Sequence, residues 1–245
     1  MQSVIEKREI ARQLQAKINA MQGLGKPVLG LESKRFAPFS SAFPDGIFPA
    51  ASLHEFISYE PADAASTTGF ITALAGKFMK EGGLCLWIGN EQKIFPAGLK
   101  HFGLEPDRIV FINTPKLHDV MWIIEEALKC EALTAVMAEV KQLGFTESRR
   151  LQLAVENSGV TGFIHRFQPY GENATACTAR WKITSLPSRI DQDVPGVGHS
   201  SWDVQLVKVR NGRPDSWQVT WSDGQFVPIH QKQFSILQTR ERHAG

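Results

Sequence analysis

Cysteine is scarce in this sequence. Only Cys85, Cys130 and Cys177 occur among 245 residues, and each lies more than forty residues from the next. Cysteine-based metal sites need closely spaced pairs, and a disulfide framework needs a denser, even-numbered set. The spacing therefore excludes a cysteine-based metal site and argues against stabilisation by disulfides. The apolar neighbours of Cys85 and Cys130 predict that both are small core residues.

Long apolar runs and a strong charge imbalance are also missing. No run approaches the ~20 apolar residues of a membrane helix, and the N-terminus is charged early and has no apolar signal core. The formal net charge is only +2, so any surface that attracts nucleic acid must be local. With 42% hydrophobic and 21% charged residues, we expect an ordinary globular protein, cytoplasmic and without membrane contact.

Apolar runs alternate with segments of helical spacing from Leu53 onward. Such alternation indicates βαβ units and a mainly parallel sheet. After Gln168 the pattern changes to period-two segments around an Asn211-Gly212 turn, which predicts antiparallel strands at the edge of that sheet. Strands are predicted at 53–57, 84–88, 109–112, 134–138, 160–165, 179–183, 202–209 and 217–221, with an interruption at 186–200; helices are predicted at 67–81, about 94–102, 117–130 and 147–157. The helix 117–130 is apolar nearly all round, which predicts burial.

The segment before the first strand has a different composition. A helix is predicted at 3–21, and a glycine- and proline-containing stretch separates it from the rest of the chain. The next residues are rich in proline and phenylalanine, which predicts an irregular segment pinned to the core by Phe36, Phe39, Phe43 and Phe48. The predicted organisation is an N-terminal helix in 1–22, an irregular connecting segment in 23–52, an α/β core in 53–231 and a C-terminal tail in 232–245.

The stretch from Tyr59 to Lys80 has the position of a phosphate-binding P-loop but lacks the residues that a P-loop needs. A strand, a loop at 60–69, a helix and a second strand are the setting of a phosphate-binding P-loop. A working P-loop needs glycines, so that backbone N–H groups can surround phosphates, and a lysine that reaches them. This loop has no glycine before Gly69 and no lysine before Lys77. The sequence therefore predicts the scaffold without the phosphate chemistry.

The order of elements from about Phe43 to Trp221 resembles the RecA-like recombinase core. Two stretches, Glu147 to Arg166 and Val207 to Trp217, are similar to the ImuA family, RecA/SulA-like accessory proteins of bacterial mutagenic translesion synthesis. The ordered set of segments carries the resemblance, since no single motif is decisive. It implies an α/β fold with a RecA-like three-layer core, in which a mainly parallel central sheet carries antiparallel C-terminal edge strands.

The resemblance also implies a degenerate P-loop. Placed on that fold, Pro61, Ser66 and Thr67 stand at the two glycines and the lysine of the P-loop, and Thr68 keeps the hydroxyl that would meet magnesium. Losing the lysine removes a charge-assisted contact to the β- and γ-phosphates. We therefore expect no nucleotide cofactor, no metal and no enzymatic activity.

Two acidic residues fall near catalytic positions of RecA-like ATPases. The resemblance places Glu139 at the acidic residue that closes the fourth strand, and Glu91 near the glutamate that activates water. Together with Thr68 they keep open the alternative of a divergent DNA-dependent ATPase. The residues themselves favour two ordinary carboxylates at strand ends.

The polar loop 168–178 lies where RecA places a mobile DNA-binding loop. Arg166, Arg180 and Lys182 flank it, and Tyr170 and Trp181 are near enough to stack on bases. These residues predict weak binding of single-stranded DNA, and a solvated charged rim explains them equally well. Both interpretations stay open.

Two further regions are candidate partner surfaces. Lys208, Arg210 and Arg213 flank the turn at Asn211-Gly212, where they either contact a partner or keep an edge strand soluble. The tail offers Phe234, Ile236 and Leu237 as apolar anchors.

The implied function is that of a non-catalytic scaffold in the SOS response to DNA damage. The resemblance implies three partners: an ImuB-like relative of Y-family polymerases, a C-family polymerase and RecA. A SulA-like inhibitor of cell division is a further alternative, because it shares the fold.

Overall fold

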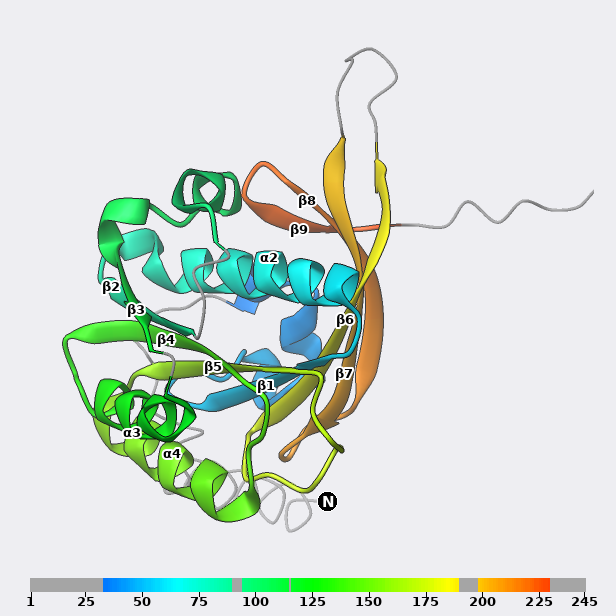
Figure 1. The fold of residues 1–245 in the computed structure, drawn as a ribbon. Helices are drawn as coiled ribbons and strands as arrows, with labels where there is room; N and C mark the ends of the chain where they lie inside the picture. Colours follow the sequence, from blue (N-terminus) through cyan, green and yellow to red (C-terminus); the bar gives the residue numbers. More distant parts are fainter. Residues whose placement is uncertain (1–32, 90–93, 115, 190–197, 230–245) are drawn as a thin grey trace, which may run out of the picture.

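The computed structural model describes residues 33–89, 94–114, 116–189 and 198–229. In these residues a nine-stranded sheet of order β3-β2-β4-β5-β1-β6-β7-β8-β9 forms the middle of three layers. Helix α2 covers one face, and α3 and α4 cover the other (Figure 1). The strands are β1 Leu53–Ser58, β2 Leu84–Gly89, β3 Ile109–Asn113, β4 Leu133–Val140, β5 Thr161–Phe167, β6 Ala179–Arg189, β7 His199–Val209, β8 Asp215–Ser222 and β9 Gln225–Pro228. The α-helices are α2 Pro61–Phe78, α3 Leu117–Leu128 and α4 Phe145–Ser158, and the short 3-10 helices are η1 Ser33–Phe36, η2 Phe39–Ala42, η3 Pro44–Gly46, η4 Met79–Glu81, η5 Pro96–Phe102 and η6 Pro106–Arg108.

Strand direction confirms the predicted fold class. Strands β1 to β5 pair only in parallel, as expected where helical crossovers connect them. Strand β6 pairs in parallel with β1 and antiparallel with β7, and β8 and β9 continue the antiparallel part. Among the described helices, none is both long and apolar enough to cross a membrane.

Helix α2 begins at Pro61, well before the predicted start at residue 67. Proline suits the first helical position because its fixed φ is helical and its missing N–H would have no partner there. Glu60 before it is extended. The loop predicted at 60–69 is therefore wrong: most of it forms the first turns of α2.

Three other predictions need correction. Helix α3 is not buried all round: Ile124 and Leu128 face the core, whereas Trp122 is 63% exposed. Cys130 is exposed and is not a core residue, whereas Cys85 is buried.

The interruption at 186–200 is shorter than predicted, because β6 continues to Arg189 and β7 begins at His199. Strand β9 was not predicted, because four residues leave too little alternation to recognise.

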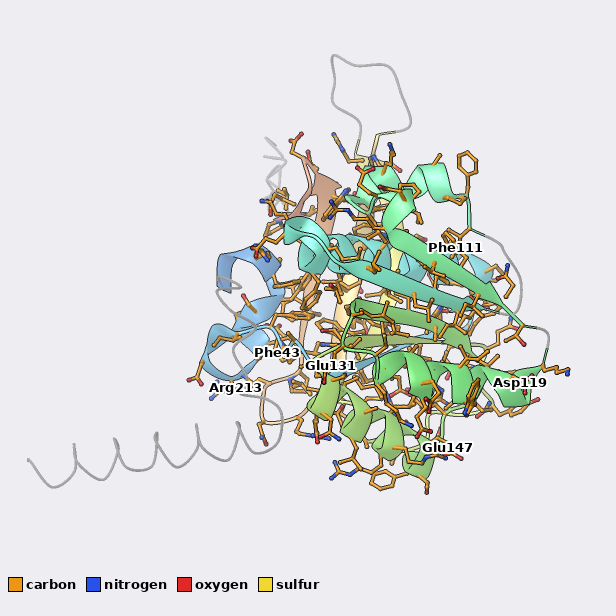
Figure 2. The ribbon with its side chains drawn as sticks, turned by 90° about the vertical axis from the view of Figure 1, so that its left-hand side faces the viewer. Phe43, Phe111, Asp119, Glu131, Glu147 and Arg213 are labelled. Carbon is orange, nitrogen blue, oxygen red and sulfur yellow. The ribbon has the colours of Figure 1, made fainter. Side chains whose placement is uncertain are left out.

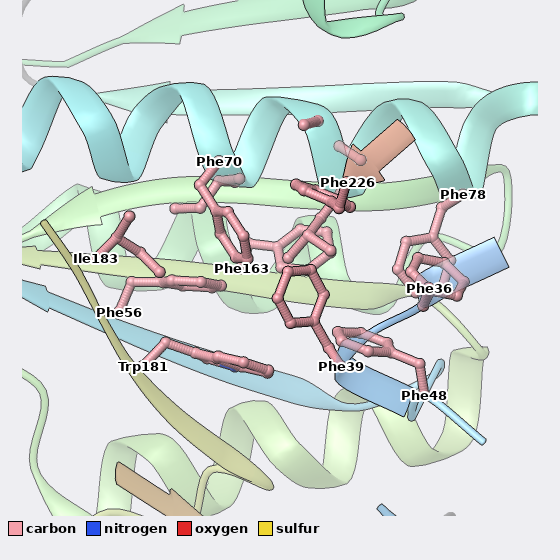
Figure 3. Packing of buried hydrophobic residues seen from close by; sticks show 14 of the residues in the cluster. Phe36, Phe39, Phe48, Phe56, Phe70, Phe78, Phe163, Trp181, Ile183 and Phe226 are labelled. Carbon is pink, nitrogen blue, oxygen red and sulfur yellow. The ribbon is translucent and has the colours of Figure 1, made fainter. Parts of the chain in front are cut away.

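The main core is an aromatic cluster between the sheet and α2. Phe39 from η2 contacts Phe70 of α2, Trp181 of β6 and Phe226 of β9, with ring centroids 4.9 to 6.0 Å apart (Figure 3). Phe36, Phe43 and Phe48 are also buried, which confirms the predicted aromatic anchoring.

A backbone hydrogen bond connects the phenylalanine-rich segment before β1 to the turn after β7. The backbone N–H of Arg213 donates to the Ala42 carbonyl at 2.9 Å, and Phe43 and Arg213 lie at the same corner of the molecule (Figure 2). A second apolar cluster joins α3 and α4 to the opposite face of the sheet, with Leu53, Ile88 and Ile164 at its centre.

Candidate interaction surface at the carboxyl edge of the sheet

The parallel strands β1, β2, β4 and β5 end at one edge of the sheet, and α2 begins there. In open α/β sheets this carboxyl edge is the usual place for a ligand. Only Tyr59 and Glu60 separate the end of β1 from Pro61. Two residues are too few to wrap a phosphate, and Pro61 offers no backbone N–H. The acidic side chains of Glu60 and Asp63 further disfavour an anion at this helix start.

The four degenerate P-loop positions all lie in α2 and form no loop. Pro61 is the first helical residue, and Ser66 is partly exposed one turn later. Thr67 is fully buried, and its hydroxyl has no hydrogen-bond partner among the described residues. Pro61 and Thr68 contribute to the lining of a cavity beside the helix.

That cavity measures about 430 Å³ and lies between α2, β2, β4 and η5. Its walls are mainly apolar, with Trp87, Leu99 and Phe102 among them. Glu139 is the only charged residue among those described in its lining, so no described cation is available there for a phosphate. The Thr72 hydroxyl donates to the Thr68 carbonyl at 2.8 Å, which satisfies it within the helix.

Of the two predicted acidic residues, Glu91 and Glu139, only Glu139 is among the described residues. Glu139 is partly buried near the end of β4, opposite His165 of β5. Glu91 lies outside the described residues. Among the described residues, no three His, Cys, Asp or Glu side chains gather closely enough to hold a metal ion.

Two histidines of the parallel strands are buried: His165 lies near the carboxyl end of β5, and His54 lies at the amino end of β1. The Ser58 hydroxyl lies 2.7 Å from Nε2 of His165, and Nε2 of His54 lies 2.9 Å from the Pro49 carbonyl. Burial lowers the pKa of each imidazole to about 4, although the Pro49 contact partly opposes the shift at His54. Both imidazoles are therefore neutral near pH 7, and each has a hydrogen-bond partner within the core.

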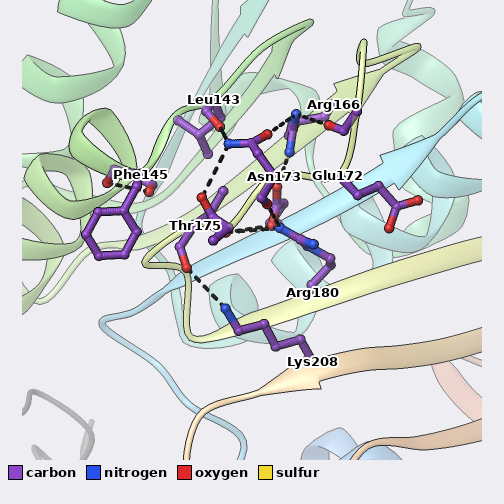
Figure 4. A network of polar contacts seen from close by, with 12 residues as sticks. Leu143, Phe145, Arg166, Glu172, Asn173, Thr175, Arg180 and Lys208 are labelled. Carbon is purple, nitrogen blue, oxygen red and sulfur yellow. Dashed lines mark hydrogen bonds and ion pairs between the residues drawn. The ribbon is translucent and has the colours of Figure 1, made fainter.

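A buried ion-pair network is centred on Glu55 of β1, and Figure 4 shows Arg166, Thr175 and Arg180 from it. One carboxylate oxygen accepts from Nη1 of Arg166 at 2.7 Å, and the other accepts from Nε of Arg180 and from the Thr175 hydroxyl, both at 2.8 Å. The side chains of Glu55 and Arg166 are fully buried. A buried carboxylate needs this degree of pairing, because desolvation of an unpaired charge is very costly.

The network also fixes the loop 168–178 against the sheet. Arg166 Nη2 donates to the Gly171 carbonyl and to Oδ1 of Asn173, each at 2.9 Å. The Asn173 amide in turn donates to the Leu143 carbonyl at 2.8 Å. These contacts join the loop to β5 and to the segment after β4, so the loop conformation depends on the Glu55 network.

The structure corrects the predicted role of two arginines. Arg166 is fully buried and Arg180 is 7% exposed, so neither guanidinium lies on a surface that a nucleic acid reaches. Both instead neutralise Glu55 and hold the loop. The sequence carried a signal for this: Glu55 lies in the middle of an apolar strand and required cationic partners.

Tyr170 and Lys182, by contrast, remain near the surface. Tyr170 is 83% exposed, and Lys141 Nζ lies 4.4 Å from its ring centroid, a cation–π contact that the sequence did not indicate. Lys182 pairs with Glu172 at 2.6 Å, and the Tyr59 hydroxyl donates to the same carboxylate at 3.0 Å. We call the following five residues the loop rim: Tyr59, Lys141, Tyr170, Glu172 and Lys182.

The predicted partner residues divide into three groups. Lys208 Nζ donates to the Thr175 carbonyl at 3.3 Å, and Arg210 Nη2 donates to the Ala176 carbonyl at 2.7 Å, so both side chains brace the loop from β7 and the turn after it. The side chain of Arg213 is exposed at the turn. The tail residues Phe234, Ile236 and Leu237, like the predicted helix 3–21, lie outside the described residues.

The described residues form a mainly parallel α/β core that is consistent with a RecA-like fold, and they include no phosphate-binding loop between β1 and α2. No protein-family model matches the chain. Two relatives named "Protein ImuA", from two strains of Caulobacter vibrioides (NA1000 / CB15N and ATCC 19089 / CIP 103742 / CB 15), are 30% identical to it over 187 residues, which cover 71% of this chain and 77% of each relative. The chain therefore belongs to the ImuA family, and this membership supports a role in DNA-damage-induced mutagenesis.

Proposed function

We propose that the chain is a non-catalytic accessory protein of mutagenic translesion synthesis in the SOS response, and that it works in the cytoplasm. Its partners in this proposal are an ImuB-like relative of Y-family polymerases, a C-family polymerase and RecA. The proposal rests on one observation: a RecA-like core is present, but α2 begins at Pro61 and leaves no loop for phosphate. A fold can keep its interfaces when its chemistry is lost.

The cavity at the carboxyl edge supports this proposal over a divergent ATPase. Phosphoryl transfer relies on cations that neutralise the charge developing on the phosphate oxygens. The described cavity lining holds the Glu139 carboxylate and no cation. No observation favours a SulA-like inhibitor of cell division.

The loop rim is the surface that best suits weak contact with single-stranded DNA. Tyr170 is exposed enough to stack on a base, and Lys141 and Lys182 are the rim's sources of positive charge. Such contact would assist a complex on damaged DNA without any need for sequence recognition.

One experiment with two readouts tests the accessory function. Purified full-length chain and its Thr68→Ala variant are assayed for ATP turnover with and without single-stranded DNA, and for co-purification with each proposed partner. We expect no turnover in either protein and equal partner binding by both. Turnover that Thr68→Ala abolishes would establish an ATPase, and failure to bind any of the three partners would remove the scaffold role.

A further inference from the structure

A second and larger cavity, of about 740 Å³, lies at the opposite end of α2. It is formed where the last turn of α2 and the following η4 meet η1, η5, η6 and the turn between β8 and β9. Four basic side chains contribute to its lining: Arg35, Lys77, Lys80 and Arg108. This cavity is separate from the apolar one at the carboxyl edge, which the first half of α2 lines.

Lys77 is the unusual member of the set, because only 6% of the residue is exposed. Its Nζ donates to Oε1 of Gln225 at 2.5 Å and lies 5.7 and 5.9 Å from the ring centroids of Trp221 and Phe226. Among the described residues, no carboxylate pairs with it. An ammonium has three N–H donors, and one neutral amide and two aromatic faces leave this charge incompletely compensated.

The pKa of Lys77 also indicates that its charge is incompletely compensated. Burial, and after it the nearby charges of Lys80 and Arg35, lower the pKa of Lys77 to about 8. Lys80 and Arg35 are therefore the neighbouring charges that act on this ammonium, and both repel it. An anion in the cavity would offset the desolvation of the Lys77 ammonium and its repulsion by Lys80 and Arg35. Both effects favour anion binding there.

The carboxylates of the lining are already engaged. Glu81 pairs with Arg35 at 2.5 Å, and Glu105 pairs with Lys100 at 3.4 Å. Asp223 accepts a hydrogen bond from the Ser222 hydroxyl at 3.0 Å.

Lys77, Lys80 and Arg108 are thus left without an ion pair to any described carboxylate. The negative end of the α2 dipole accounts for Lys77 in its last turn and for Lys80 in η4 directly after it, but it does not account for Arg108, which belongs to η6.

The walls of the cavity are built from close contacts between backbone segments. A Cβ atom at Gly76 would lie 2.7 Å from the Phe102 carbonyl oxygen and 2.9 Å from that of Gly103, so α2 and η5 touch directly. The Trp221 indole donates to the His101 carbonyl at 2.8 Å, which ties β8 to the same short helix. Neighbouring elements that are fixed in this way hold the basic groups in place before a ligand arrives, and such preorganisation favours affinity.

We infer that this cavity binds the phosphate group of a phosphorylated ligand, with Lys77, Lys80 and Arg108 as the donors to the phosphate oxygens. Phosphate fits three separate cationic donors better than a carboxylate does, because it carries more acceptor oxygens and more charge. The volume lies within the range of about 300 to 1,000 Å³ for ligand pockets, which leaves room for a group attached to the phosphate. That group belongs either to a free phosphorylated compound or to the phosphorylated end of a nucleic acid strand.

The test uses inorganic pyrophosphate as the probe and isothermal titration calorimetry on the full-length chain. We expect pyrophosphate to bind, and the Lys80→Gln/Arg108→Gln variant to bind at least tenfold more weakly. Both substituted residues are exposed, so the variant should fold normally. The control variant Lys129→Gln/Arg149→Gln removes the same charge from the region of α3 and α4 and should bind pyrophosphate as the unmodified chain does. Thr68→Ala should also leave the affinity unchanged, which separates this cavity from the carboxyl edge.

A second arm identifies the source of the phosphate. A 5′-phosphorylated oligonucleotide is compared with its 5′-hydroxyl counterpart, and both are compared with ADP. Tighter binding of the phosphorylated oligonucleotide supports a nucleic acid end as the ligand, and tighter binding of ADP supports a free compound. Absence of binding by all phosphorylated probes at millimolar concentration would overturn the inference, as would equal affinity in the two double variants.

Discussion

Substituting Glu55 by glutamine is the sharpest test of the buried network. The change keeps the shape of the side chain and one acceptor oxygen, but it removes the negative charge that Arg166 and Arg180 share. Two guanidinium groups are then left in the interior without a counter-charge. Breaking a buried pair in this way costs about 3–5 kcal/mol, because the remaining charge stays desolvated.

The assay is urea unfolding followed by tryptophan fluorescence. For a chain of this size the dependence of unfolding free energy on urea is near the upper end of ~1–3 kcal/mol/M. Glu55→Gln should therefore lower the unfolding midpoint by about 1–2 M. The control is Glu105→Gln, which breaks a solvent-exposed pair with Lys100 and should cost no more than about 1 kcal/mol.

A third variant separates stability from loop anchoring. Replacing Glu55, Arg166 and Arg180 together by apolar residues removes every buried charge of the network, and such replacements are often close to neutral for stability. The loop 168–178 nevertheless loses its tethers to Arg166 and Arg180. We expect faster limited proteolysis within the loop at nearly unchanged stability. If Glu55→Gln costs no more than Glu105→Gln, the network does not hold the fold as argued.

Two further predictions concern pH and DNA. His54 and His165 have folded-state pKa values of about 4, below the unfolded value of about 6.5. Between these two values the unfolded chain binds more protons than the folded chain. The free energy of unfolding therefore falls as pH drops from about 6.5 toward 4. Urea unfolding at pH 5 should show a loss of about 2 kcal/mol for each histidine, and a profile that stays flat from pH 7 to pH 5 contradicts this. Fluorescence anisotropy should show weak, salt-sensitive binding of a labelled single-stranded oligonucleotide, reduced several-fold by Tyr170→Ala/Lys182→Ala; an unchanged affinity would remove the loop rim from the proposal.

The strands and their mainly parallel arrangement were predictable because their signals are local and strong. Strands β1 to β5 are short apolar runs separated by helical patterns, and β8 shows clean alternation around Trp217 and Trp221. The start of α2 was harder to place, because Ala, Ser and Thr suit a loop and a helix start almost equally. The proline at residue 61 was the one local signal, since it favours the first helical position.

The candidate site was less predictable than the fold. Arg166 and Arg180 read as surface cations, because charged residues that flank a polar loop usually face solvent. Their burial results from a contact across three strands, since Glu55 of β1 lies beside Arg166 of β5 and Arg180 of β6. Nothing in the local sequence around either arginine indicates that pairing. The second cavity depends on the meeting of α2, η1, η4, η5, η6 and the β8–β9 turn, and it had no sequence signal at all.

The loss of phosphate chemistry at the carboxyl edge is a property of the backbone as well as of single side chains. Thr67 stands at the position that the family resemblance assigns to the P-loop lysine, yet it is fully buried within α2. A lysine introduced there would place an ammonium in the interior, at a cost of several kcal/mol, and would still find no loop of N–H groups to share a phosphate. Restoring nucleotide binding would therefore require a longer connection between β1 and α2, and point substitutions alone would not achieve it. Since that connection is only two residues long, we propose that this edge serves contact with a partner and not phosphoryl transfer, in line with the accessory role proposed for this chain.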